Sequence, residues 1–136
     1  MDSKRKHLEM IQGVVNRLSN NSFLLKGWSV VLVSGLFALA AKDTKPLFVY
    51  IAYFPCLVFW GLDGYFLWQE RLFRSLYDKV RVMDPKNIDF SMNTSSVCSS
   101  TKSWPEAVIS KTLLAFHGAV FATIIIVMLA LWHYSK

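Results

Sequence analysis

Residues 59–74, FWGLDGYFLWQERLFR, join a membrane-type segment to a charged helix without a break. The first half is aromatic and apolar, yet it holds the carboxylate of Asp63 between two glycines. The second half carries arginines on a helical pattern that continues beyond the apolar run. The stretch therefore predicts one long helix that crosses a membrane and projects into the aqueous phase on one side.

The whole chain has the composition of a small integral membrane protein. Of its 136 residues, 54% are hydrophobic and 15% are aromatic. The apolar residues form three blocks, each close to the roughly 20 residues that a bilayer requires, at residues 23–41, 46–68 and 112–132. No signal-peptide pattern is present, so the first block is expected to start insertion. We therefore predict an all-α membrane protein with three transmembrane helices.

The lysines and arginines predict the orientation of these spans. Twelve of the fifteen lie in residues 1–26 and 69–111, whereas the opposite side has only Lys42, Lys45 and Lys136. Because cytoplasmic loops carry an excess of lysine and arginine, the N-terminus and the middle segment are expected in the cytoplasm. The C-terminus is then external.

The predicted organisation has four parts. They are a cytoplasmic amphipathic helix (1–22), a transmembrane hairpin (23–68), a cytoplasmic extension of the second helix followed by a Ser-rich loop (69–111), and a third transmembrane helix with a short external tail (112–136). The first helix is expected to end at the polar run 19–22, with Ser22 capping the first membrane helix. A capping box at Ser103 and Glu106 is expected to start a helix that runs through the third span.

The two cytoplasmic helices are expected to pack on each other. The N-terminal helix has an apolar seam, and the extension has an apolar side opposite its arginines. One copy of the chain offers little cytoplasmic mass to bury both seams, which favours a homo-oligomer. Closed symmetry would then repeat the arginines as a ring.

Asp63 is the first candidate functional residue. Helical rise across the hairpin places Asp63 and Lys26 within about 3 Å of the same depth, so the two charges are expected to pair. Alternatively, Asp63 lines a pore or gate, because ionisable groups inside spans usually face a cavity or partner. Gly61 and Gly64 beside it favour close helix approach or a hinge. His117 in the third span is expected to hydrogen-bond a neighbouring helix.

The basic residues form the second candidate site. Arg71, Arg74 and Arg81 share one side of the extension, and Lys4, Arg5 and Lys6 are weaker candidates. Two ligands fit such a surface: anionic lipid headgroups, or a soluble nucleotide or oligonucleotide. The 2 cysteines and 3 histidines show no metal-ligand spacing, and no catalytic constellation is recognisable. We expect no cofactor, no metal and no enzymatic activity.

Several segments resemble a family of small bacterial membrane proteins. They are NSFLLKGW (21–28), ALAAK (38–42), YFP (53–55) and DGYFLWQERLFRSLYDKVR (63–81). In size and plan the chain is similar to membrane effectors of anti-phage defence, most of all the membrane subunits of Hailong systems. The resemblance implies an oligomeric inner-membrane ion channel. It further implies that oligodeoxyadenylate, supplied by a partner nucleotidyltransferase, occupies the basic cytoplasmic part and inhibits the channel.

Other functions remain open on the sequence. A membrane scaffold or anchor that docks a cytoplasmic partner protein is the main alternative. A holin-like lysis protein also has three spans, but the basic N-terminal helix and the lack of a charged C-terminal tail argue against it. A transporter is disfavoured because one acidic residue near the membrane edge makes a poor proton relay.

Overall fold

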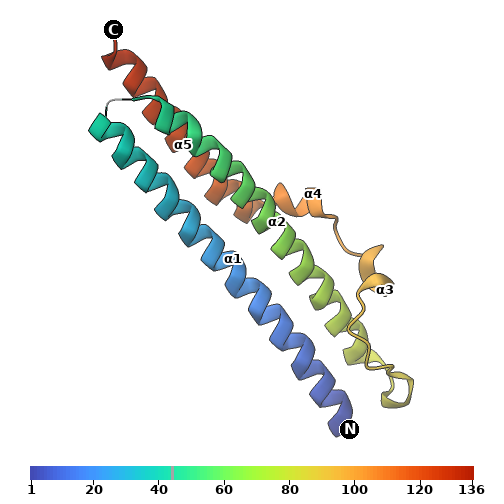
Figure 1. Ribbon diagram of the computed structural model, residues 1–136. Coiled ribbons are helices and arrows are strands. Elements are labelled where there is room, and N and C mark those ends of the chain that lie inside the picture. The colour runs from blue at the N-terminus through green and yellow to red at the C-terminus, as the bar shows by residue number, and fades with distance from the viewer. Residues whose placement is uncertain (44) are drawn as a thin grey trace.

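The protein is an antiparallel helical hairpin with a third long helix beside it (Figure 1). The computed structural model describes residues 1–43 and 45–136; Thr44, which the sequence places in the hairpin turn, lies outside them. The described elements are α1 (Asp2–Asp43), α2 (Leu47–Val82), η1 (Pro85–Asn87), α3 (Ser95–Cys98), α4 (Trp104–Val108) and α5 (Lys111–Tyr134). No strand occurs in this described part, so the predicted all-α fold is confirmed.

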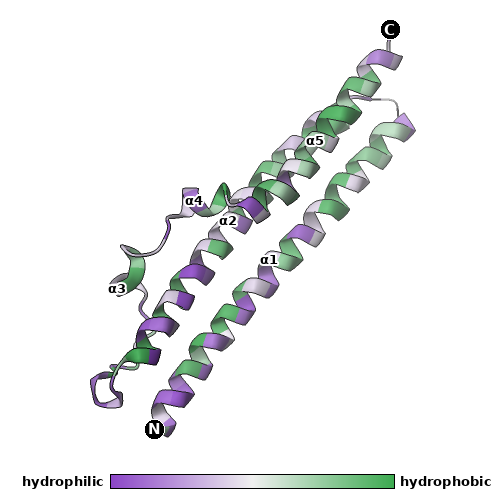
Figure 2. Ribbon diagram, turned by 180° about the vertical axis from the view of Figure 1, so that it is seen from behind, coloured by the Kyte–Doolittle hydropathy of each residue, from purple (hydrophilic) through white to green (hydrophobic). Residues whose placement is uncertain are grey.

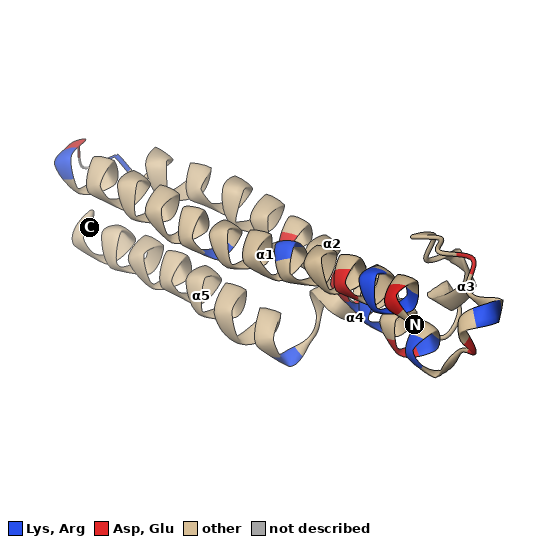
Figure 3. Ribbon diagram, turned by 90° about the horizontal axis from the view of Figure 1, so that it is seen from below, with Lys and Arg blue, Asp and Glu red and all other residues tan. Residues whose placement is uncertain are grey.

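Three of these helices are long and apolar enough to cross a membrane: α1, α2 and α5. With 42 and 36 residues, α1 and α2 are about 63 and 54 Å long, against roughly 30 Å of hydrocarbon. Each can therefore cross a bilayer and still project beyond it. Figure 2 shows hydrophilic residues concentrated at the N-terminal end of α1 and along the neighbouring part of α2. Figure 3 shows most charged residues at that same end.

The first helix does not end where the sequence predicted. Residues 19–22 lie inside α1, so there is no separate N-terminal helix and Ser22 is not a cap. Serine and asparagine are poor helix formers, but each costs only about 0.5 kcal/mol relative to alanine. The buried positions recur at helical spacing on both sides of the run, from Ile11 and Val15 to Ser29 and Val33. Packing along α2 therefore outweighs the local preference.

Two hydrophobic clusters hold the hairpin together. One lies among the spans and joins Val33 of α1, Cys56 of α2 and Ile124 of α5. The other lies in the projecting part and joins Ile11 of α1 to Leu76 of α2. It is completed by Val80 of α2 and by Ile88 and Val97 from the segment that follows α2.

The second cluster confirms one prediction made from the sequence and contradicts another. The N-terminal part of α1 and the extension of α2 pack on each other as predicted. However, Ile11, Leu76 and Val80 are at most 5% exposed within a single chain. The expectation that one copy lacks the mass to bury both seams was wrong, because the segment after α2 folds back over them.

The connection between α2 and α5 is more structured than predicted. It contains α3 within the Ser-rich loop, and the hydroxyl groups of Thr101 and Ser75 share a hydrogen bond at 2.9 Å. The capping box at Ser103 and Glu106 is present and starts α4. The helix then breaks at Ile109, and α5 starts anew after Ser110, so the single helix predicted from the capping box was wrong.

Candidate functional site

A buried polar cluster joins α1, α2 and α5 at the centre of the fold. Asp63 and His117 are fully buried, at 0% exposure. Lys26 Nζ lies 2.6 Å from Asp63 Oδ2, and His117 Nε2 lies 2.7 Å from the same oxygen. Ser22 Oγ donates to Asp63 Oδ1 and accepts from Lys26 Nζ at 2.8 Å. The ion pair expected from the hairpin register is therefore present.

The long helices explain why these four groups meet. Ser22 and Lys26 are one turn apart and share a face of α1, while Asp63 projects from the facing side of α2. A buried carboxylate is stable only when its charge and its lone pairs are satisfied. Here an ammonium supplies the charge, and a hydroxyl and an imidazole supply further donors.

Two tryptophans and α4 cover the cluster on one side. The rings of Trp60 and His117 stack with centroids 5.9 Å apart and planes at 9°. Trp60 Nε1 donates to the carbonyl of Val108 at 2.9 Å, and Trp104 Nε1 donates to the carbonyl of Gly61 at 3.1 Å. Because both bonds join α2 to α4, they hold α4 over the region of Asp63.

The two glycines beside Asp63 have different roles in packing. A Cβ on Gly64 would lie 3.1 Å from Val108 Cα and closer still to the Val108 side chain, so this position requires a glycine. A Cβ on Gly61 would meet nothing within 4 Å. The predicted close approach of helices is thus confirmed at Gly64 but not at Gly61. At Gly61 the contact with α4 is the hydrogen bond that the backbone carbonyl accepts from Trp104, and it does not depend on the absence of a side chain.

The basic candidates are not gathered into one site within the chain. Arg74 pairs with Glu70 at 2.8 Å, Arg81 with Asp78 at 3.7 Å, and Arg5 with Glu9 at 3.6 Å, each within its own helix. Lys4 Nζ donates to the carbonyls of Arg81 and Met83 at 2.8 and 2.7 Å, and so caps the carboxyl end of α2. Lys6 lies near His7 and Phe90 at the N-terminal end of α1.

Arg71 lies apart from the other arginines. It lines a cavity of about 510 Å³ formed with the segment around α4 and the start of α5. Its Nη1 atom is shielded from solvent and has no hydrogen-bond partner among the described residues. The three arginines do lie on one side of α2, as the sequence predicted. However, Arg71 lines the cavity, whereas Arg74 and Arg81 lie on the exposed surface in ion pairs within the helix.

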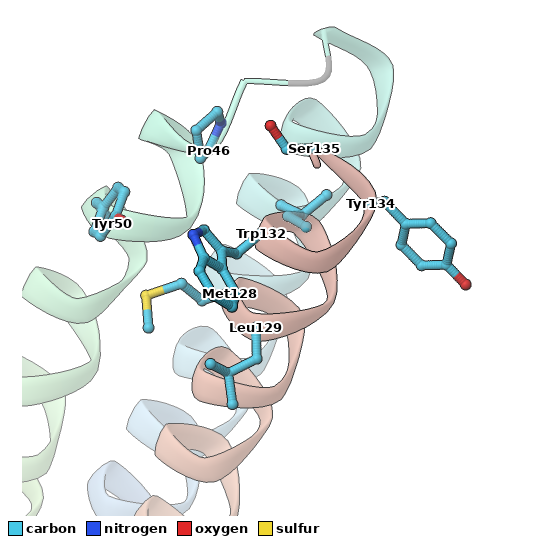
Figure 4. A pocket seen from close by; sticks show the side chains of 8 residues that line it. Pro46, Tyr50, Met128, Leu129, Trp132, Tyr134 and Ser135 are labelled. Atoms are coloured by element: carbon cyan, nitrogen blue, oxygen red, sulfur yellow. The ribbon is translucent and has the colours of Figure 1, made fainter.

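A further cavity, of about 400 Å³, lies at the opposite end of the spans (Figure 4). Met128 and Trp132 of α5 face Tyr50 and Pro46 across it, while the ring of Tyr134 points away. Lys136 Nζ lies 4.1 Å from the centroid of the Trp132 ring. Trp132 and Tyr134 are exposed here, as expected for residues that anchor a helix at the membrane surface.

Sequence reasoning missed part of the Asp63 cluster. Ser22 was assigned to a helix cap. The expected hydrogen bond from His117 to a neighbouring helix is confirmed, but its partner Asp63 was not predicted. The helical register would have linked Ser22 to Lys26, one turn away. Nothing in the sequence fixes the position of α5 relative to the hairpin. In the described residues, no group of three histidine, cysteine or acidic side chains is placed to hold a metal ion.

Comparisons with known proteins give no match. No family model, no curated protein and no solved structure is similar to the chain, and nothing in these comparisons identifies an effector of the Hailong type.

Proposed function

We propose that the chain forms a homo-oligomeric ion channel in the membrane, gated by an anionic nucleotide or oligonucleotide at its basic projecting end. The observation that carries this proposal is the buried Asp63–Lys26 pair, with His117 on the same carboxylate. Ionisable groups inside membrane spans are costly, and they commonly mark ion pathways or gates. Asp63, Lys26 and Gly64 are the proposed gate residues, with Gly61 beside them on α2.

The long helices offer a route from ligand to gate. Helix α1 is continuous from Arg5 to Lys26, and α2 is continuous from Asp63 to Arg81. A ligand that changes how the projecting ends pack would therefore act on the Lys26–Asp63 pair through two rigid elements. Such a ligand shifts the equilibrium only if it contacts the open and closed arrangements differently. The exposed arginines at that end, Arg74 and Arg81, supply the contacts for phosphates.

We infer a biological role in anti-phage defence from the resemblance to membrane effectors of such systems. We place the protein in the bacterial inner membrane with its N-terminus in the cytoplasm, which the distribution of lysine and arginine supports. A partner nucleotidyltransferase would supply the oligodeoxyadenylate that inhibits the channel. Infection would remove the ligand and open the pore.

Nucleotide content of the purified protein tests the ligand. The absorbance ratio at 260 and 280 nm, followed by extraction and mass analysis, is expected to reveal bound nucleotide in the wild type. Arg74→Glu with Arg81→Glu should lose it, because the contacts become repulsive. The same change of charge at the other end, Lys42→Glu with Lys45→Glu, should retain it. If the wild-type protein is free of nucleotide after mild purification, the proposal that it binds a nucleotide or oligonucleotide is contradicted.

A scaffold that docks a cytoplasmic protein is the second candidate. Apolar side chains are exposed near the projecting end, outside the predicted spans: Met10 at 58%, Val82 at 78% and Phe90 at 48%. Contiguous exposed apolar surface there would suit a protein partner. Induced expression separates the two functions, because a channel without its ligand should depolarise cells, whereas a scaffold should leave the membrane potential unchanged.

A further inference from the structure

The cavity beside Arg71 has the chemistry of a phosphate site. Its lining comes from α2, from the segment around α4, and from the first residues of α5: Arg71, Lys102, Glu106, Ile109, Ser110, Lys111 and Thr112. Three of these side chains are cationic and one is anionic, so the lining has a net positive charge. The carboxylate, that of Glu106, already accepts a hydrogen bond from the Ser103 amide at 2.8 Å.

Two polar atoms of this lining are left without partners. Arg71 Nη1 and Ser110 Oγ are both shielded from solvent, and neither has a hydrogen-bond partner among the described residues. Orphaned buried polar groups cost free energy, and an arginine group costs most of all. A phosphate oxygen between Arg71 and Ser110 would satisfy both atoms.

The amino end of α5 adds to the same site. Ser110 occupies the N-cap position, but its hydroxyl makes no capping hydrogen bond. The first N–H groups of a helix have no partner within it and carry a partial positive charge, which favours phosphate. In this 24-residue helix those groups belong to Lys111 and Thr112, which also line the cavity.

The depth of the cavity indicates where its phosphate comes from. Lys111 and Trp132 are separated along α5 by about 30 Å of helical rise, which matches the thickness of the hydrocarbon core. Trp104, 46% exposed, lies on α4 near the same boundary, where tryptophan is enriched. The cavity therefore opens at the level of lipid headgroups, on the projecting side of the spans.

We propose that Arg71, Ser110 and Lys111 form a phosphate site that takes the headgroup of an anionic phospholipid or a soluble phosphate compound. The site is separate from the Arg74 and Arg81 surface and does not depend on channel activity. Occupied by lipid, it would fix α5 and α4 against α2 at the membrane boundary, next to the Asp63 cluster.

Native mass spectrometry of delipidated protein in detergent tests this site. The probes are phosphatidylglycerol, diacylglycerol (the same tails without phosphate), inorganic phosphate and dAMP. We expect a phosphatidylglycerol adduct whose dissociation constant rises about tenfold in Arg71→Gln, the size expected for one lost charged hydrogen bond. Arg17→Gln, at an exposed position of α1 outside both proposed sites, is the matched control and should bind as the wild type does. Lys111→Gln, at an exposed position, should weaken binding without disturbing the fold.

The outcomes separate the two sources of phosphate. Arg71-dependent binding of phosphatidylglycerol, without competition from dAMP or inorganic phosphate, assigns the site to lipid. Arg71-dependent binding of dAMP or inorganic phosphate, with no lipid adduct, assigns it to a soluble ligand. If no probe distinguishes either Arg71→Gln or Lys111→Gln from the wild type, or if diacylglycerol binds as well as phosphatidylglycerol, the proposal is overturned.

Discussion

Lys26 of α1 and His117 of α5 converge on one oxygen of Asp63, at 2.6 and 2.7 Å. A single carboxylate of α2 therefore links all three membrane-type helices, and Ser22 occupies its other oxygen. The linkage makes the relative position of the three helices sensitive to one charge. In any membrane protein of this fold, the Asp63 carboxylate would stabilise the packing of the three helices. In a channel, a change in its contacts would also open or close the gate.

Removing the carboxylate should destabilise the fold strongly. Asp63→Ala leaves the Lys26 ammonium and the His117 imidazole without their partner, and breaking a buried ion pair in this way costs about 3–5 kcal/mol. Replacing both charges, Lys26→Met with Asp63→Leu, should recover most of that loss, because no uncompensated charge remains. Equilibrium unfolding in mixed micelles measures both. An Asp63→Ala protein as stable as the wild type would show that the pair does not form.

The two glycines near Asp63 should respond in opposite directions to alanine. Gly64→Ala forces a Cβ against Val108 and should cost about 1–3 kcal/mol, the usual range for overpacking. Gly61→Ala meets open space and should stabilise α2 by about 0.5–1 kcal/mol, since alanine is the better helix former. Adding Val108→Ala to Gly64→Ala should restore part of the loss. Thermal unfolding gives the comparison, and equal effects at both positions would rule out the close contact of α4 with α2.

The continuity of α1 through residues 19–22 can be tested at Asn20. This residue is exposed inside the helix, so Asn20→Ala should stabilise the protein by about 0.5 kcal/mol. Were the helix to end here with Ser22 as the cap, Asn20 would lie in the turn before it, where asparagine is favoured, and Asn20→Ala would not stabilise the protein. Ser22→Ala should be destabilising by about 1–3 kcal/mol, because Asp63 and Lys26 both lose a hydrogen-bond partner. The sign of the Asn20 effect decides between the two structures.

The indole hydrogen bonds should hold α4 on α2. Trp60→Phe and Trp104→Phe each remove one N–H donor to a backbone carbonyl, at a cost of about 1 kcal/mol. Hydrogen exchange of the α4 amides should therefore accelerate about fivefold in each variant. Trp132→Phe, at the far end of α5, is the control and should leave α4 unchanged. If neither Trp60→Phe nor Trp104→Phe changes the exchange rate of the α4 amides, these two hydrogen bonds do not hold α4 on α2.

Much of the architecture could be predicted from periodicity and charge. The block of apolar residues that contains Asp63 predicted a span, and the apolar side around Leu76 predicted packing against the N-terminal part of α1. The antiparallel register alone brought Lys26 level with Asp63. These features follow from the regular rise and turn of two helices joined by a short link, and the sequence pattern indicates both the helices and the link.

The remainder depends on tertiary packing. The polar run 19–22 has the local preference of a helix end, yet Ser22 is needed as a helical neighbour of Lys26. His117 reaches Asp63 only because α4 and the break at Ile109 direct α5 back along α2. The cavity at Arg71 combines residues distant in sequence, so no local pattern could indicate Ser110 or Lys102 as its neighbours.

Ion flux through liposomes tests the central claim most directly. Purified protein, stripped of nucleotide and reconstituted, is expected to release trapped potassium at a rate above that of protein-free liposomes. Added oligodeoxyadenylate should reduce this flux in the wild type but not in Arg74→Glu with Arg81→Glu. If the liposomes retain potassium as well as empty liposomes do, with and without the oligonucleotide, the proposed channel activity is contradicted. The membrane scaffold would then be the better explanation of the structure.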